Sequence, residues 1–392
     1  MTSVGAFKIL VLAHDLSDPA ISRRVSMLKM GGATVKVGGF YRSATPIENV
    51  CDCTTVNFGR THNGGFIKRC IAVLREILFL HRHRALFVDT DIILARNLEM
   101  LAIAVRGQRL TPMRPVIVYE VLDIHRLLLG KNSVGSLLRA FEGRLTRHAS
   151  ALLTSSPAFI TYYFEQISNI KLPAHLVENK LLTMAQNLPT VGANQRQKAP
   201  PWRIGWYGII RCKESLDILR DLVRQGDGKI EVVIRGRPAL DQIEDFHERV
   251  ADESGLRFDG PYKNPDDLAA LYNNVHFTWT IDMYEAGQNS SWLLPNRLYE
   301  GGAFGAVPIA IDGLETSNFI KRLGIGVSLQ HPLGATLVDF FSKLTLEKYF
   351  ELESAVKNVP RSVWAHDDED CQNLVDYLVE LKQPARHAND DE

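Results

Sequence analysis

Short apolar runs alternate with amphipathic segments along almost the whole chain. An apolar run bounded by turn residues is typical of a buried strand, and apolar residues three or four apart are typical of a helix. In the first half we expect strands at 7–13, 34–38, 91–94, 115–119 and 151–154. We expect helices at 19–30, where Gly31-Gly32 ends the pattern, and at 66–81.

The alternation stops at 188–201, where proline, glycine and glutamine replace the apolar runs, and it then starts again. This segment predicts a linker between domains. Beyond it we expect strands at 202–207, 230–234, 275–280 and 307–310, and helices at 213–223, 239–254, 265–272 and 296–304. A last amphipathic helix is expected at 363–383.

Alternating strands and helices predict parallel sheets with helices on both faces. At 392 residues the chain is longer than a single hydrophobic core usually supports. We therefore expect an α/β protein with two Rossmann-like, doubly wound domains that face each other across a cleft. The first domain covers 1–190 and receives the helix 363–383, and the second covers 200–360. Open α/β sheets bind ligands at the carboxyl ends of their strands, which favours a nucleotide-type ligand.

Charge is distributed unequally although the total is zero. There are 23 basic and 13 acidic side chains before residue 191, and 22 and 32 after it. A basic first half is expected to meet an anionic ligand or surface. The total lacks the basic surface of nucleic-acid-binding proteins, so no nucleic acid is expected as a partner.

Several classes of protein are disfavoured by missing motifs. The turn after the first expected strand, 13–19, lacks the G-x-G-x-x-G of dinucleotide enzymes, and no P-loop occurs. No zinc or calcium motif is present, so we predict no metal and no cofactor. Five scattered cysteines are expected to be reduced thiols of a cytoplasmic protein. Neither a signal sequence nor an apolar stretch of membrane-spanning length is apparent.

Candidate anion-binding residues lie in the second half. Gly208, Arg211 and Lys213 are expected where a strand ends and a helix starts, which suits a diphosphate. A solvated basic helix start is the alternative. Arg235 ends another expected strand in the same half.

The segment 294–310 is the most informative part of the sequence. Asn296 starts an expected helix, and Glu300 lies one turn after Arg297. A carboxylate only accepts hydrogen bonds, so Glu300 is suited to hold the two hydroxyls of a ribose. The alternative is a surface Arg297–Glu300 pair, which contributes only ~0.2–0.5 kcal/mol.

The segment 294–310 resembles the P-x-K/R-L-x-E-x-x-A-x-G-x-P signature of glycosyltransferase family 4. Further elements resemble that family in the same order along the chain. These are 17–25, 119–125, 177–180, the set Gly208, Arg211 and Lys213, and 256–272. The chain is most similar to bacterial exopolysaccharide enzymes of the succinoglycan type.

The resemblance implies a GT-B fold and a retaining, metal-independent transfer of a hexose from a nucleotide diphosphate sugar. The acceptor would be a saccharide, lipid-linked in this context. The resemblance and the pattern together assign the donor to Gly208, Arg211, Lys213, Arg235, Pro261, Tyr262, Asn296, Arg297 and Glu300. The candidate catalytic residues are His125, Asp123 and Glu120, and Arg23 and Arg24 are assigned to the acceptor side.

Some of these assignments have open alternatives. His125 beside a carboxylate could take a proton from an acceptor hydroxyl, or it could simply be satisfied at a helix start. For Arg24, an exposed surface charge is the simpler interpretation. The family often has a glutamate eight residues before Glu300, whereas this chain has Trp292, and Glu285 with the polar residues 288–291 could replace that glutamate. The donor sugar is therefore open, and a sugar-nucleotide epimerase, a phosphorylase or a non-catalytic binding protein are alternatives.

The expected helix 66–81 combines basic and apolar side chains. The basic residues in and after it are Lys68, Arg69, Arg75, Arg82 and Arg84. Such a helix can lie on an anionic bilayer, which predicts peripheral attachment to the inner face of the cytoplasmic membrane. A helix that covers a sheet is the simpler interpretation of most of these apolar residues.

Overall fold

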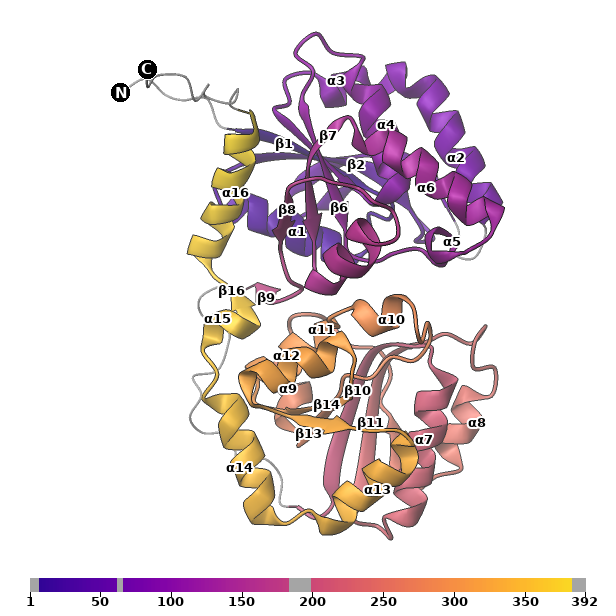
Figure 1. The fold of residues 1–392 in the computed structure, drawn as a ribbon, viewed down its shortest axis with the longest axis vertical. Helices are drawn as coiled ribbons and strands as arrows, with labels where there is room; N and C mark the ends of the chain where they lie inside the picture. Colours follow the sequence, from indigo (N-terminus) through magenta and orange to yellow (C-terminus); the bar gives the residue numbers. More distant parts are fainter. Residues whose placement is uncertain (1–6, 62–65, 183–198, 383–392) are drawn as a thin grey trace. The chain divides into compact units, whose positions relative to one another are not determined.

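The computed structural model of the protein describes residues 7–61, 66–182 and 199–382. It separates into two compact units, each built around its own sheet (Figure 1). The first unit comprises Met1–Glu178 and Asp367–Glu392, and the second comprises Asn179–His366. The chain thus leaves the first unit at Glu178 and returns to it at Asp367. Most of the expected linker, 188–201, lies outside the described residues.

The first unit contains an eight-stranded sheet in which all neighbours are parallel except one edge pair. In spatial order its strands are β3 (Asn49–Val50), β4 (Cys53–Arg60), β2 (Thr34–Tyr41), β1 (Lys8–Ala13), β5 (Ile92–Arg96), β6 (Val116–Val121), β7 (Ala149–Thr154) and β8 (Ala174–Leu176). The inner strands β1 and β5 are almost wholly buried, as expected for a parallel sheet covered on both faces.

The helices of the first unit cover both faces of its sheet. They are α1 (Pro19–Met30), α2 (Phe66–Phe79), the 3₁₀ turn η1 (Leu80–His83), α3 (Arg84–Phe87), α4 (Asn97–Gln108), α5 (Arg126–Leu129), α6 (Ser133–Thr146), the π-helical η2 (Phe159–Glu165) and α16 (Asp368–Lys382). The C-terminal helix α16 packs against α1 on one face, and α4 packs against α2 and α6 on the other (Figure 1). Asp18 caps α1 by accepting a hydrogen bond from Ala20 N.

The second unit contains a six-stranded, entirely parallel sheet. In spatial order its strands are β12 (Leu256–Phe258), β11 (Ile230–Pro238), β10 (Trp202–Ile210), β13 (Phe277–Trp279), β14 (Val307–Ile311) and β15 (Val327–Leu329), and a separate pair joins β9 (Leu181–Leu182) to β16 (Ala365–His366). Its helices are α7 (Lys213–Gln225), α8 (Phe246–Ala251), α9 (Leu268–Asn273), α10 (Asn289–Trp292), α11 (Asn296–Ala303), α12 (Glu315–Leu323), α13 (Leu333–Lys343), α14 (Leu346–Lys357) and α15 (Arg361–Trp364).

The expected fold class is confirmed, and local details differ. The β3–β4 hairpin was not expected, because its turn residues Cys51 and Asp52 adopt positive φ angles of 48° and 62° without the usual glycine or asparagine. The helix expected at 239–254 is confined to Phe246–Ala251, because turns occupy the residues before it. Strand β10 continues through Gly208 to Ile210, three residues beyond the expected end at 207.

Candidate functional sites

In the second unit, the order of strands places a ligand site between β10 and β13. From β10 the chain moves outward to β11 and β12, then returns to the other side of β10 as β13. Ligands of doubly wound sheets bind where the strand order reverses in this way, beside the carboxyl ends of the strands. Arg211 follows β10 and Asp282 follows β13, so both lie at this point.

Arg211, Arg297 and Asp282 form a charged cluster at this switch point. Arg211 Nη2 lies 3.0 Å from Asp282 Oδ2. The Arg297 guanidinium donates to Ile281 O at 2.8 Å and interacts electrostatically with Asp282 and Arg211. Burial acts to raise the pKa of Asp282, but the two arginines outweigh it and hold that pKa below its usual value. The cluster contains more positive than negative charge, which suits an anionic ligand.

Neighbouring groups hold Arg211 in place beside the start of α7. The ring of Tyr284 lies 4.8 Å from the Arg211 guanidinium carbon, within cation–π distance. Lys213 is exposed at the first position of α7, and Cys212 caps this helix through a 3.3 Å contact from Ser215 N to its Sγ. A diphosphate at this point would meet the helix dipole as well as both basic side chains.

Glu300 is buried on α11, with 4% of its surface exposed. Oε1 accepts a hydrogen bond from Asn264 Nδ2 at 2.8 Å, and Oε2 accepts one from Tyr272 Oη at 3.0 Å. The interpretation as an exposed Arg297–Glu300 pair is wrong, because Glu300 is buried and the Arg297 guanidinium reaches Ile281 O. Burial and then Glu300 raise the pKa of Tyr272 well above its usual value, so this phenol remains a donor.

The remaining predicted donor residues lie on β10, β11, α11 and the loop after β12. Gly208 and Gly236 face each other on β10 and β11, and a Cβ on Gly236 would lie 1.8 Å from Gly208 O. Arg235 donates to Pro261 O at 2.6 Å, which ties β11 to the loop after β12. The Tyr262 side chain is half-buried, and burial and then Glu300 raise its pKa. Pro261 and Asn296 are exposed.

Trp292, the last residue of α10, stands where the family often has its additional glutamate. Asn289 and Ser290 are buried, and Trp292 is half-buried. Ser290 Oγ accepts a hydrogen bond from Glu285 N at 3.0 Å, so this hydroxyl serves the loop itself. The expectation that Glu285 and residues 288–291 replace the missing carboxylate stays a prediction.

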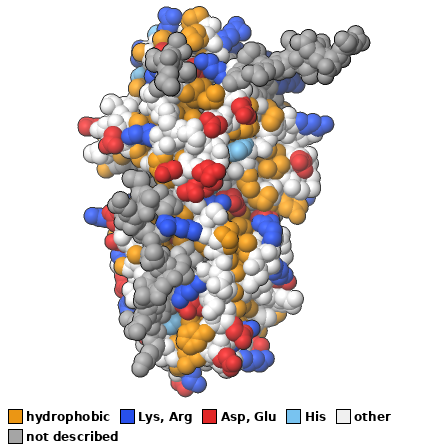
Figure 2. All heavy atoms as spheres, turned by 90° about the vertical axis from the view of Figure 1, so that its left-hand side faces the viewer, with side chains coloured by type: hydrophobic (Ala, Val, Ile, Leu, Met, Phe, Trp, Pro, Cys, Tyr) orange, Lys and Arg blue, Asp and Glu red, His pale blue; other side chains and the backbone are white. Residues whose placement is uncertain are grey.

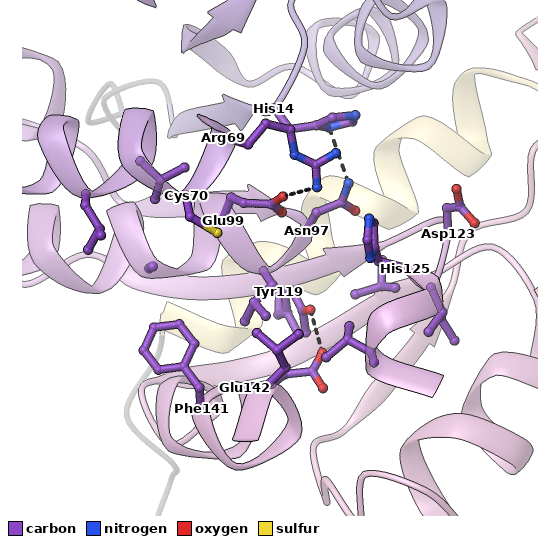
Figure 3. Close-up of a pocket in the computed structure, with 18 of the residues that line it drawn as sticks. His14, Arg69, Cys70, Asn97, Glu99, Tyr119, Asp123, His125, Phe141 and Glu142 are labelled. Carbon is purple, nitrogen blue, oxygen red and sulfur yellow. Dashed lines mark hydrogen bonds and ion pairs between the residues drawn. The ribbon is translucent and has the colours of Figure 1, made fainter. Parts of the chain in front are cut away.

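In the first unit, the order of strands reverses between β1 and β5, and polar side chains gather there. His14 follows β1, Asn97 follows β5, and Asp123 and His125 follow β6, the next strand in the sheet. His14 Nδ1 lies 3.4 Å from Asn97 Nδ2 (Figure 3). Asn97 has a φ of 71°, a left-handed backbone conformation that asparagine tolerates and that is frequent at functional sites. No sequence motif marks His14 or Asn97 as site residues.

His125 is positioned as a hydrogen-bond donor. Its Nδ1 accepts a bond from Leu127 N at 3.3 Å and thereby caps α5. Burial, followed by the charge of Arg69, lowers the pKa of His125, so the ring is neutral and carries its proton on Nε2. This tautomer donates from Nε2 and cannot accept a proton there. A role as a base at Nε2 does not fit this tautomer, and a catalytic role of His125 stays a prediction. Asp123 is exposed and points away from His125 (Figure 3).

Glu120 does not belong to the catalytic candidates, because it is fully buried between two arginines. Its carboxylate lies 2.6 Å from Arg24 Nε and 2.7 Å from Arg96 Nε. Burial would raise the pKa of Glu120, but Arg96 and Arg24 outweigh it and lower that pKa to about 2. Arg24, with 4% exposure, is likewise a buried partner of Glu120 and neither a surface charge nor an acceptor ligand. Arg23 is half-buried and its acceptor role stays a prediction.

A cavity of about 410 Å³ opens beside His14, Asn97 and His125. Its walls come from α2, α4, α5, α6 and η2. Arg69 Nη2 binds Glu99 Oε1 at 2.8 Å along one wall. Deeper in the cavity the Tyr119 hydroxyl donates to Glu142 at 2.7 Å (Figure 3). Burial raises the pKa of Glu142 to about 7. Glu142 was not predictable from the sequence, because no motif surrounds it along the chain.

Comparison with known proteins shows the family to which the chain belongs. No family model matches the chain. The succinoglycan biosynthesis protein ExoL of Rhizobium meliloti (strain 1021) is 43% identical over 377 residues, which cover 95% of this chain and 94% of that protein. The chain belongs to the ExoL family. The similarity to succinoglycan-type enzymes expected from the sequence is thereby confirmed.

Solved structures share the whole fold. Anabaena Alr3699/HepE in complex with UDP has a TM-score of 0.68 at 14% identity, covering 95% of this chain and 100% of that one. A glycosyltransferase from Rickettsia africae has a TM-score of 0.66 at 12% identity, covering 97% and 100%. The ExoL-family chain therefore has the GT-B glycosyltransferase fold.

Three further findings concern the described residues only. None of the helices in 7–61, 66–182 and 199–382 is long and apolar enough to cross a bilayer. Within the same ranges, no group of three or more His, Cys, Asp or Glu side chains is arranged to hold a metal ion. The five cysteines are free thiols.

Proposed function

We propose that this ExoL-family protein transfers a hexose from a nucleotide diphosphate sugar to a lipid-linked saccharide during bacterial exopolysaccharide assembly. The 43% sequence identity to ExoL is the observation that carries this proposal. The UDP in the Alr3699/HepE structure supports a nucleotide diphosphate as the ligand of this fold. The charged cluster at the switch point of the second unit supplies a place for its diphosphate.

The proposed transfer proceeds with retention and without a metal ion. Charge that develops on the leaving diphosphate is stabilised by Arg211, Lys213 and the start of α7, which are in place before the reaction. Glu300 accepts hydrogen bonds from the ribose, and the loop at Pro261 and Tyr262 holds the base. Retention follows from the resemblance to glycosyltransferase family 4.

In the first unit, His125 donates from Nε2 to a hydroxyl of the transferred sugar or the acceptor. At the carboxyl ends of the strands of the same sheet, Asn97 Nδ2 contacts His14 Nδ1. The free thiols fit a cytoplasmic protein that works at the inner face of the membrane.

Removal of the diphosphate ligands tests the donor site. We expect Arg211→Ala to weaken binding of UDP by about tenfold, because it removes a charged donor, and Lys213→Ala to weaken it less, because Lys213 is exposed. Lys343→Ala, which removes an exposed lysine on α13, is the matched control and should bind as wild type does. Calorimetric titration measures all three. Wild-type affinity in both site variants would remove these residues from the donor site.

Membrane attachment is proposed through α2. Ile71, Leu74 and Leu78 are exposed by 59%, 59% and 71%, and Lys68 and Arg75 are exposed on the same helix. Arg69 was also expected to contact the membrane, but its guanidinium is paired with Glu99, so the proposed attachment does not include it. The face that carries α16 instead shows interspersed acidic and basic side chains (Figure 2).

Neutralising Lys68, Arg75, Arg82 and Arg84 should reduce co-sedimentation with anionic vesicles. Each basic residue near such a surface contributes about 1 kcal/mol, so the loss should be large at low salt and small at high salt. Equal binding of the wild type to neutral vesicles would contradict this electrostatic account.

A further inference from the structure

A second cavity of the first unit, of about 450 Å³, is lined by a different side of α2 from the cavity beside His125. Its walls also come from β2, β4 and η1. Residues three or four positions apart share one side of a helix, and those of α2 that line this cavity are Lys68, Ile71, Ala72, Arg75, Glu76 and Phe79. The proposed sugar transfer does not use this cavity.

The lining of this second cavity carries a net positive charge. Among its described residues, Glu76 is the single acidic side chain. Burial lowers the pKa of His83, so this ring is neutral. Four basic side chains, all exposed and without an ion pair to another described residue, outnumber Glu76; they are Arg60, Lys68, Arg75 and Arg82. This charge balance suits an anionic ligand.

Glu76 requires more of the ligand than a negative charge. The residue is 8% exposed, and its Oε1 is buried without a hydrogen-bond partner among the described residues. His83 Nε2 lies 3.7 Å from this oxygen, beyond hydrogen-bond distance. Buried carboxylate oxygens usually accept a hydrogen bond. A ligand of this cavity should therefore bring a donor to Glu76, which a phosphate diester group alone does not offer.

A phosphate ester that also carries hydroxyl groups meets both requirements. Its phosphate would accept hydrogen bonds from the basic side chains, and a hydroxyl would donate to Glu76 Oε1. An ammonium group could also donate to Glu76, but a zwitterionic head group would leave the positive charge of the lining unbalanced. Phe40 and Phe58, which pack edge to face at 5.7 Å, offer apolar surface to the carbon atoms of a glycerol.

The cavity borders the apolar residues through which membrane attachment is proposed. Ile71 and Phe79 line it and are 59% and 41% exposed. Leu74 and Leu78 follow Ile71 by three and seven positions, so they continue the same exposed stripe of α2. A lipid whose head group lies in the cavity can therefore keep its apolar chains in a bilayer on which α2 rests.

We propose that this cavity binds the phosphoglycerol head group of an anionic phospholipid. The phosphate lies among Lys68, Arg75 and Arg82, and a glycerol hydroxyl donates to Glu76 Oε1. The inference rests on the attachment through α2 that is part of the proposed function. It adds that attachment selects one lipid chemistry, whereas a basic helix alone would respond only to the charge of the surface.

Two lipids of equal charge test this selectivity. Phosphatidylglycerol and phosphatidylmethanol are both phosphate diesters with one negative charge, but only the first carries hydroxyl groups on its head group. We expect the protein to bind phosphatidylcholine vesicles that contain phosphatidylglycerol about tenfold more tightly than vesicles with the same fraction of phosphatidylmethanol. Equal co-sedimentation with the two kinds of vesicle would overturn the proposal.

A matched pair of variants assigns the selectivity to Glu76. Glu76→Met removes both carboxylate oxygens but keeps a long, helix-favouring side chain. We expect this variant to lose the preference for phosphatidylglycerol and to bind phosphatidylmethanol vesicles at least as tightly as the wild type, because a negative charge is removed. Glu380→Met, which removes an exposed carboxylate on α16, is the control and should keep the preference. An unchanged preference in Glu76→Met would contradict the proposed contact.

A soluble ester distinguishes a lipid ligand from a free phosphate. We expect calorimetry with glycerol 1-phosphate to show only millimolar binding, because the free ester lacks the apolar chains that a bilayer holds beside Ile71. Micromolar binding of glycerol 1-phosphate would identify a soluble phosphate ester as the ligand and would overturn the lipid proposal.

UDP binding separates this inference from the proposed function. Glu76 and Glu380 belong to the first unit, so both variants should keep wild-type UDP affinity, and unchanged thermal unfolding shows that they are folded. If the wild type prefers phosphatidylglycerol but binds no nucleotide, the proposed function fails and the head-group site stands. If nucleotides bind and the two kinds of vesicle are not distinguished, the head-group site fails and the proposed function stands.

Discussion

Replacing Glu120 with glutamine should lower the free energy of unfolding by about 3–5 kcal/mol, because it leaves two buried arginines without their counter-ion. Arg24 and Arg96 are 4% and 1% exposed, so water cannot take over the role of the carboxylate. The contacts of 2.6 and 2.7 Å to the two Nε atoms would each lose a charged acceptor. Chemical denaturation of the wild type and of Glu120→Gln measures the difference.

The dependence of stability on pH provides an independent readout. The pKa of Glu120 is about 2 in the folded protein, below its ordinary value of 4.5. The unfolded chain therefore binds a proton first as the pH falls, and the stabilisation by Glu120 is lost between about pH 4.5 and pH 2. Glu120→Gln should remove this part of the acid sensitivity.

A surface pair supplies the control for Glu120. Glu231 binds Arg203 at 2.7 Å but is 37% exposed, so Glu231→Gln should cost no more than about 1 kcal/mol. If Glu120→Gln keeps wild-type stability but loses turnover, the buried ion pairs are unimportant and a catalytic role for Glu120 returns.

Glu300→Gln should weaken binding of the nucleotide diphosphate by about ten- to a hundredfold. The carboxylate accepts hydrogen bonds only, and each charge-assisted bond to a ribose hydroxyl contributes about 1.5–3 kcal/mol. The amide would turn one acceptor into a donor and leave a hydroxyl hydrogen without a partner. Titration of wild type and Glu300→Gln with UDP gives the ratio of affinities.

Tyr272→Phe distinguishes ribose binding from the structural contacts of Glu300. It removes the 3.0 Å bond from the phenol but keeps the carboxylate. We expect a stability loss of about 1 kcal/mol with nearly unchanged nucleotide affinity. If Tyr272→Phe weakens UDP as much as Glu300→Gln does, Glu300 acts by holding α11 in place and the ribose assignment is wrong.

The fold was predictable because burial imposes a strong pattern. Parallel strands covered on both faces are nearly continuous apolar runs, and β1, β5 and β14 are apolar except for Lys8 at the start of β1 and Arg96 at the end of β5. Local exceptions were not predictable. The turn at Cys51 and Asp52 adopts positive φ angles through its surroundings, without a residue that prefers them. The apolar positions after residue 238 likewise predict a helix that begins at 239, whereas α8 begins at Phe246.

The candidate sites were predictable only where a motif marked them. Arg211, Arg297 and Glu300 lie in motifs, but Asp282 is 71 residues from Arg211 and approaches it only through the order of the strands. His14 and Asn97 are 83 residues apart for the same reason. Glu120 was misassigned because successive strand residues point to opposite faces: Tyr119 lines the cavity, whereas Glu120 meets Arg24 of α1.

The central claim is the transfer of a sugar, and incubation with radiolabelled nucleotide sugars and bacterial lipid extract tests it most directly. We expect one labelled nucleotide sugar of a panel to pass its label into the lipid fraction. We expect Glu300→Gln to reduce the initial rate at limiting donor by about ten- to a hundredfold. Conversion of the donor into an isomeric nucleotide sugar would identify an epimerase instead. Tight nucleotide binding with no label in lipid from any donor would contradict the account.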